Sequence, residues 1–232
     1  MAVDVNSVYQ KVLALANKEQ RGYVTPQEFN LFADKAQLEI YENYFHKIKM
    51  TEMKPKTQTS YSDELEILEE KLHPFHVDTN VETSDASLTL PTDIYKMIGI
   101  TRSGNKVTQV NKSQISYTEK HPLIKATTSR SVFVREDSNT VTIHPAPSLI
   151  SETFEVSYYK KPTSPKWTYV VLNGKALYNA NANDLQNFEL HASEEENLVY
   201  KILMLAGLIM KQPDVQQAAA AGIEMNKREQ NS

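Results

Sequence analysis

The segment SVFVREDSNTVTIHPAP, residues 131–147, contains two short β-branched runs, 131–135 and 140–143. Residues of this type favour strands, and Glu136-Asp-Ser-Asn139 between the runs is typical turn material. His144-Pro-Ala-Pro147 cannot continue a central strand, because proline has no backbone N–H to donate. The segment therefore predicts two strands joined by a turn.

The same pattern extends outward on both sides. Further strand-like runs cover residues 87–90, 97–101, 106–110 and 153–159. No helical pattern separates them, so a βαβ arrangement is not indicated. The central region predicts an antiparallel sheet or a small β-sandwich.

The N-terminal region has helical periodicity. Apolar residues at helical spacing predict a first helix over 8–16, broken at Arg21-Gly22. Thr25-Pro-Gln-Glu28 is a capping-box start for a long helix that ends before Lys54-Pro55. A third helix, capped by Ser62, is expected to end before His73-Pro74.

The C-terminal region also reads as helical. Asn183-Asp184 can cap a helix that runs to Ile209 and stops at Gln212-Pro213, and an Ala-rich helix over 215–228 follows. The predicted fold is α+β, a helical layer from the N- and C-terminal segments with an inserted antiparallel β-sheet or small β-sandwich. The expected division is 1–80, 81–170 and 171–232, with the C-terminal helices packing on the N-terminal ones and a tail following them.

The composition of the chain excludes several classes of function. The chain has 232 residues, a net charge of −4 and no cysteine, which excludes disulfides, thiolate metal sites and a cysteine nucleophile. No apolar run reaches the roughly 18–20 residues of a membrane span, and the first residues do not form a signal peptide. Residues 81–170 hold 11 Lys/Arg against 8 Asp/Glu, a net of +3 that is weak for a nucleic-acid binder.

No common catalytic or nucleotide-binding motif occurs, and neither an enzyme nor a cofactor is predicted. His73 and His76 with Asp78 form a conceivable metal-ligand start for a hydrolase. Exposed or carbonyl-capping histidines beside a helix end explain the pattern better.

Two segments lack apolar anchors for a lone subunit. Residues 111–130 form a long connection, and 216–222 are almost entirely Gln and Ala. Both would make sense if another subunit covered them. The predicted contact residues are Lys112, Tyr117, Lys120, Lys125, Arg130, Arg135, Pro213, Val215, Ile223, Met225 and Arg228.

The order of several short segments carries a resemblance. They are 6–15, the helix start 25–30, Leu88-Thr-Leu-Pro-Thr-Asp within 88–100, 141–147, Phe154-Glu-Val-Ser-Tyr-Tyr-Lys-Lys-Pro162 and the closing helix 195–210. In this order the chain resembles the head-to-tail adaptor, or tail-tubular-type connector, ring proteins of short-tailed double-stranded DNA bacteriophages. The opening segment and the Tyr-Tyr-Lys-Lys-Pro strand look most similar to ring proteins of crAss-like phages.

The resemblance implies a structural virion protein without enzymatic activity. It implies a homo-oligomeric ring of about twelve subunits in the virion neck. Its partners would be the portal protein and tail or other ring proteins, and double-stranded DNA would pass through without specific binding during ejection. Made in the host cytoplasm, such a protein needs no membrane or cofactor. The alternatives are a non-viral assembly adaptor or protein-binding module and, third, the metal-dependent hydrolase.

Overall fold

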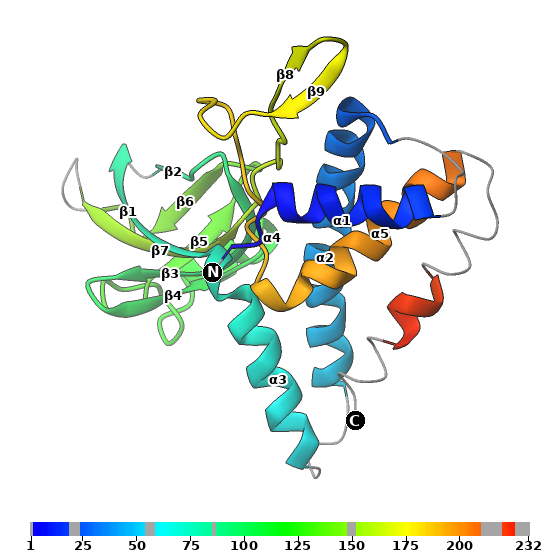
Figure 1. Ribbon diagram of the computed structural model, residues 1–232. Coiled ribbons are helices and arrows are strands. Elements are labelled where there is room, and N and C mark those ends of the chain that lie inside the picture. The colour runs from blue at the N-terminus through cyan, green and yellow to red at the C-terminus, as the bar shows by residue number, and fades with distance from the viewer. Residues whose placement is uncertain are drawn as a thin grey trace. The chain divides into compact units, whose positions relative to one another are not determined.

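The computed structural model describes residues 2–18, 24–53, 59–84, 87–147, 152–209 and 220–225 (Figure 1). The chain divides into two compact units. The helical unit comprises Met1–Pro74 and Pro162–Ser232, and the barrel unit comprises Phe75–Lys161. No helix among these described residues is long and apolar enough to cross a membrane.

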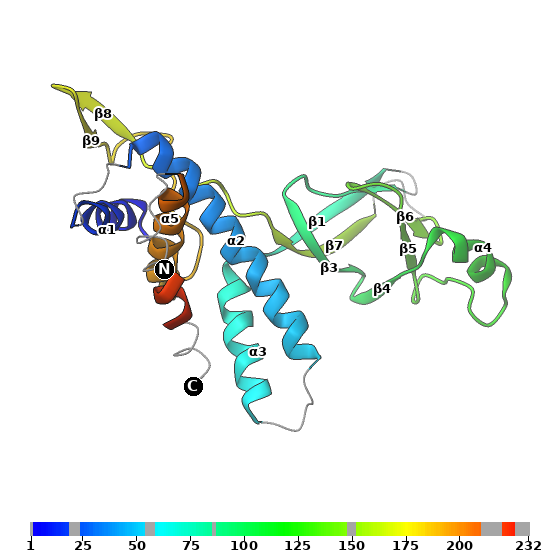
Figure 2. The same ribbon diagram turned by 90° about the vertical axis from the view of Figure 1, so that its right-hand side faces the viewer.

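The helical unit is built from helices that are far apart in the sequence. They are α1 (Val5–Lys18), α2 (Pro26–Glu52), α3 (Thr59–Leu72), the 3₁₀ turn η2 (Ala192–Glu194) and α5 (Glu195–Ile209), and the 3₁₀ turn η1 (His73–Phe75) leads from α3 into the barrel unit. Helix α5 packs on α1 and α2, and α3 packs on α2, as Figures 1 and 2 show. A small two-stranded sheet, β8 (Tyr169–Leu172) and β9 (Lys175–Tyr178), completes the unit.

The start of α2 follows from its local sequence. The Thr25 side chain accepts a hydrogen bond from the backbone N–H of Glu28, and the Glu28 carboxylate accepts one from the backbone N–H of Thr25. This capping box satisfies N–H groups that would otherwise lack partners at the helix start. The predicted start at Thr25 is confirmed, and α2 ends before Lys54 as expected.

A buried ion pair joins α3 to η2, the turn that directly precedes α5. Lys71 Nζ lies 2.8 Å from Oε1 of Glu194, and the two side chains are only 9% and 2% exposed. The Asn197 amide donates a second hydrogen bond to Glu194. Burial raises the pKa of Glu194, but the hydrogen bonds from Asn197 and Lys71 and the Lys71 charge outweigh it, so the pKa lies below its ordinary value. Glu194 is therefore a charged carboxylate inside the unit.

The barrel unit is a closed sheet of seven strands. They are β1 (His76–Ser84), β2 (Ser87–Thr89), β3 (Ile94–Arg102), β4 (Asn105–Gln109), β5 (Val132–Arg135), β6 (Thr140–His144) and β7 (Thr153–Lys160). The order around the barrel is β1-β2-β6-β5-β4-β3-β7, and β7 pairs with β1 to close it. Every neighbouring pair is antiparallel except β4 and β5, which are parallel. Inward-facing apolar residues, including Ile100, Phe133, Phe154 and Val156, fill the interior.

The expected fold class, a helical layer with an inserted antiparallel sheet or sandwich, is wrong. The β region closes into a barrel because β1, which the sequence analysis did not predict, pairs with β7 through residues 76–82 and with β2 through 83–84. Register shifts within β3, between Ile94 and Lys96 and again between Met97 and Gly99, add curvature. A sheet curved in this way brings its two edges together and buries them.

Three further expectations are corrected. Residues 183–191 form irregular structure rather than a helix, with Asp184 in an ion pair with Lys166. Ser62 lies inside α3, which begins at Thr59. The strands β8 and β9 were not predicted. Of the Ala-rich C-terminal helix, 220–225 is helical, and the predicted stop at Gln212-Pro213 lies outside the described residues.

Candidate subunit-contact surfaces

The 111–130 segment is a crossover between two parallel strands. Its first half forms α4 (Lys112–Lys120), none of whose residues is buried. Parallel neighbours such as β4 and β5 cannot be joined by a tight turn, and they need a connection of roughly a dozen residues or more, usually a helix. The length of this segment thus has a reason within the subunit, so length alone does not indicate a partner.

The second half of the segment is ordered by its own polar contacts. The Arg130 guanidinium donates hydrogen bonds to the backbone carbonyls of Leu123 and Lys125, each at 3.1 Å. Ala126 is buried and anchors the loop, whereas Leu123 at its tip is 81% exposed. The loop is therefore held in one shape while its largest apolar side chain points to solvent.

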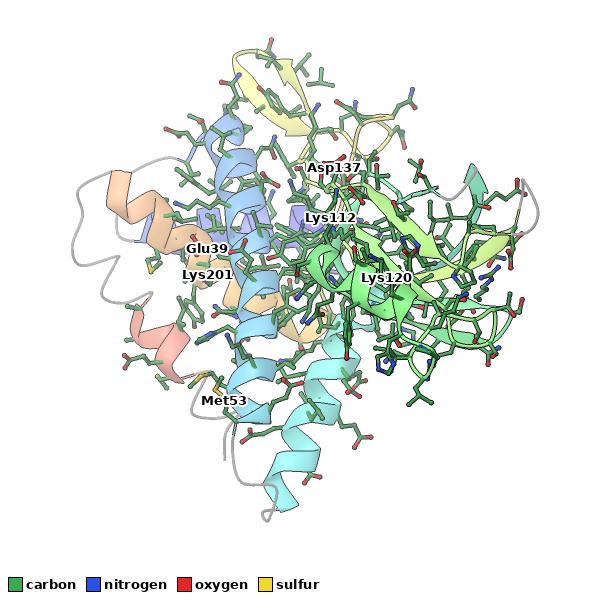
Figure 3. All side chains as sticks on the ribbon, turned by 180° about the vertical axis from the view of Figure 1, so that it is seen from behind. Glu39, Met53, Lys112, Lys120, Asp137 and Lys201 are labelled. Atoms are coloured by element: carbon green, nitrogen blue, oxygen red, sulfur yellow. The ribbon has the colours of Figure 1, made fainter. Side chains whose placement is uncertain are left out.

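The predicted cations of this region fall into two groups. Lys112 forms an ion pair with Glu136, whose hydrogen bond and charge raise the pKa of the lysine. Arg135 donates to the backbone carbonyls of Asp137 and Ser138, so it stabilises the β5–β6 turn. Within the described ranges, Lys120 and Lys125 have no ion-pair partner. Figure 3 shows Lys112 and Lys120 on α4 with Asp137 near Lys112.

The exposed group on this side of the barrel is apolar and cationic. We name Tyr117, Lys120, Leu123 and Lys125 the α4 surface. Tyr117 is 63% exposed, although its ring lies 5.4 Å from that of His121. An aromatic and a leucine held outward beside two cations suit contact with an acidic protein surface. Three of the predicted contact residues, Tyr117, Lys120 and Lys125, thus belong to this exposed surface, and Leu123 is a residue that the sequence analysis did not predict.

The predicted tail contacts are described only in part. Ile223 is half-buried and Met225 is 62% exposed on the helical stretch 220–225. A Cβ placed on Gly222 would lie 2.8 Å from the Tyr200 ring, so this stretch packs closely against α5. Pro213, Val215 and Arg228 lie outside the described residues.

The metal-ligand hypothesis receives limited geometric support. His76 Nδ1 lies 3.6 Å from Oδ2 of Asp78. Among the residues that the structure describes, no group of three or more His, Cys, Asp or Glu side chains is arranged to hold a metal ion, so His73 does not complete a site with this pair.

The β8–β9 hairpin is a surface that sequence reasoning missed. Val170, Val171, Leu172 and Leu177 are each at least half exposed. Asn173 and Gly174 form the turn with φ of 51° and 75°, the left-handed geometry that tight hairpins favour. Asn-Gly between two apolar runs was the signal that could have found it.

Ordered elements that present several apolar side chains to solvent are typical of proteins that bind other macromolecules. The comparison with protein families agrees with that class. The model described as SU10 adaptor protein matches residues 58–230, about three quarters of the chain, and the chain belongs to this family. It is a phage adaptor-type structural protein, which confirms the coarser part of the resemblance. No curated protein matches the chain.

Proposed function

We propose that this protein is a subunit of a ring in the phage neck that joins the portal to the tail and extends the DNA channel. The observation that carries the proposal is the match to the SU10 adaptor family over residues 58–230. Exposed apolar side chains on the ordered α4 surface and on the β8–β9 hairpin support it, because a subunit that works inside an assembly needs such surfaces.

The proposed partners are further copies of the chain, the portal protein and tail or other ring proteins. A ring arises when one patch of a subunit binds a different patch of its neighbour and the rotation closes, here after roughly twelve copies. The α4 surface and the tail 213–232 are the proposed contacts with the portal or the next ring.

The charge of the barrel unit suits a channel that DNA crosses without being held. The barrel unit, residues 75–161, holds 10 Lys/Arg and 9 Asp/Glu, a net charge of only +1. A strongly basic lumen would bind phosphates through counterion release and slow the exit of the genome.

The deciding experiment measures the mass of the purified protein by light scattering across a concentration series, with negative-stain imaging of the same samples. Rings of about twelve subunits are expected, either alone or after the cognate portal is added as a template. A protein that stays monomeric and also fails to join the portal would overturn the proposal.

A further inference from the structure

The two faces of the β8–β9 hairpin differ in their surroundings. Side chains alternate across a two-stranded sheet, and the register pairs Val170 with Leu177 and Leu172 with Lys175. One face therefore carries Val170, Leu172, Lys175 and Leu177, which we name the hairpin outer face. All four are exposed, so this face is a row of three apolar side chains with a cation at one end.

Aromatic packing and hydrogen bonds fix the hairpin to the rest of its unit. Tyr169 and Tyr178, on its other face, stack on the Trp167 ring at centroid distances of 5.7 and 5.8 Å. Trp167 is 2% exposed, and its indole N–H donates to Asn6 while Asn30 binds its backbone. In Figures 1 and 2 the hairpin stands clear of the helices of its own unit. A rigid apolar projection loses little conformational entropy when it docks.

The same unit carries a groove of matching chemistry. A cavity of about 320 Å³ lies between α1 and α5 and is lined by Lys11, Ala14, Leu15, Glu196, Val199 and Tyr200. Leu15 is 44% exposed at its edge. Lys11 is already paired with Glu195 at 2.9 Å, which leaves Glu196 as the exposed charge of the groove. Within the described part of the chain, Glu196 has no ion-pair partner, and neither has Lys175.

We infer that the hairpin outer face of one copy docks in the α1–α5 groove of a neighbouring copy, with Lys175 beside the neighbour's Glu196. The occupant is a second copy of this chain, because one subunit carries both an apolar row ending in an unpaired cation and an apolar groove edged by an unpaired anion. Such a contact is heterologous, the type that closes into rings. The inference rests on the proposed ring function and specifies which surfaces form the ring.

The size of the contact predicts its strength. A stable interface buries roughly 800 Å² on each partner, and a face of four side chains provides only part of that. A single contact between two free subunits is therefore weak, whereas closure of the ring makes each contact reinforce the others. The test must detect a weak encounter as well as a ring.

Cysteine cross-linking meets this need, because the natural chain contains no cysteine. We would mix Leu172→Cys and Leu15→Cys copies carrying different mass tags, oxidise them and measure the hetero-linked dimer. Val171→Cys, on the other hairpin face, replaces Leu172→Cys in the matched control. The expected result is a hetero-dimer yield at least several-fold higher for position 172. Equal yields from both positions, or no hetero-linked dimer, would overturn the inference.

Charge reversal tests the pairing itself. Lys175→Glu and Glu196→Lys are each expected to weaken self-association by about five-fold, and the double variant is expected to recover it. Lys106→Glu, an exposed change on the barrel unit, is the control. Rings that form unchanged in both single variants would reject this contact and leave the neck-ring function standing. Failure of the unaltered chain to join either itself or a portal would reject the function.

Discussion

Lys71 and Glu194 show how strongly single residues determine the stability of the helical unit. A buried charge that loses its partner keeps the full cost of its removal from water. Lys71→Met is therefore expected to lower the free energy of unfolding by about 3–5 kcal/mol. Chemical denaturation would measure it. In the control Lys166→Met the lost partner is the exposed Asp184, and the unfolding midpoint should stay almost unchanged. Equal effects of the two substitutions would contradict this role of burial.

The same pair predicts how stability changes in acid. The pKa of Glu194 is lower in the folded chain than its ordinary value of 4.5, so its contribution is fully present above about pH 4.5. That contribution is lost as the pH falls through the folded-state pKa. Glu194→Gln should flatten the decline of the unfolding free energy below pH 4.5. Glu42→Gln, at an exposed position on α2, should leave the decline as it is.

Arg102 has a comparable role in the barrel unit. It is 3% exposed, and two of its nitrogens each lie 2.7 Å from an oxygen of Glu152, while a third hydrogen bond reaches Ser131. Lysine cannot reproduce this planar fork. Arg102→Lys should therefore cost at least about 2 kcal/mol in thermal or denaturant unfolding. Arg135→Lys, an exposed change on β5, is the comparison, and similar losses from both would show that the buried geometry does not matter.

At the scale of elements, the loop after α4 depends on Arg130. Its guanidinium binds the carbonyls of Leu123 and Lys125, whereas the other hydrogen bonds of this stretch are concentrated at Thr127–Ser131. Arg130→Ala should leave global stability nearly unchanged and speed limited proteolysis within 121–130 several-fold, because cleavage follows local opening. An unchanged cleavage pattern would show that the buried Ala126 and the hydrogen bonds of Thr127 and Ser131 are enough to order the loop.

The elements also show which parts of the fold the sequence reveals. The start of α2 was predictable because Thr25, Pro26 and Glu28 contact only one another and the first helical turn. The closure of the barrel was not, because β1 pairs with β7 across more than 70 residues. The sequence of β1, HVDTNVETS, does alternate Val and Thr with polar residues, a local strand signal that the sequence analysis did not use, but nothing in it indicates the pairing with β7. Contacts between residues close in the sequence, such as the capping box, could be predicted, whereas strand pairing between distant residues could not.

The candidate surfaces follow the same division. The sequence predicted contacts at Tyr117, Lys120 and Lys125, and these side chains are exposed on α4 and the loop that follows it. The sequence analysis explained the length of the 111–130 segment by a missing partner. The true reason is that β4 and β5 are parallel neighbours, which need a crossover connection, and this pairing is not visible in the sequence of the segment itself. Asn173-Gly174 could have predicted the hairpin itself. Its outer face could not be predicted, because that face depends on the strand register and on which side chains are exposed.

For the whole molecule, the tail is expected to contribute to assembly more than to folding. Among the described residues, most of the buried core of the helical unit lies on α1, α2, α3 and α5, for example at Val12, Phe29, Leu72 and Ile202. Deletion of 213–232 should therefore leave a cooperatively unfolding subunit with a nearly unchanged midpoint. The same subunit should no longer dock onto its neighbours or the portal, as seen by light scattering and co-sedimentation.

A point substitution distinguishes the loss of one side-chain contact from the loss of the whole tail segment. Met225 is 62% exposed on the helical stretch 220–225, so Met225→Ser removes an apolar contact without disturbing a core. If the tail reaches a partner through this side chain, Met225→Ser should reproduce part of the docking defect of the deletion. Gly222 lies against the Tyr200 ring, and Tyr200 also lines the α1–α5 groove, so deleting the tail changes the surroundings of that groove as well. A deletion that abolishes docking while Met225→Ser does not would place the effect at the groove, and unchanged assembly of the deletion variant would reject a role of the tail.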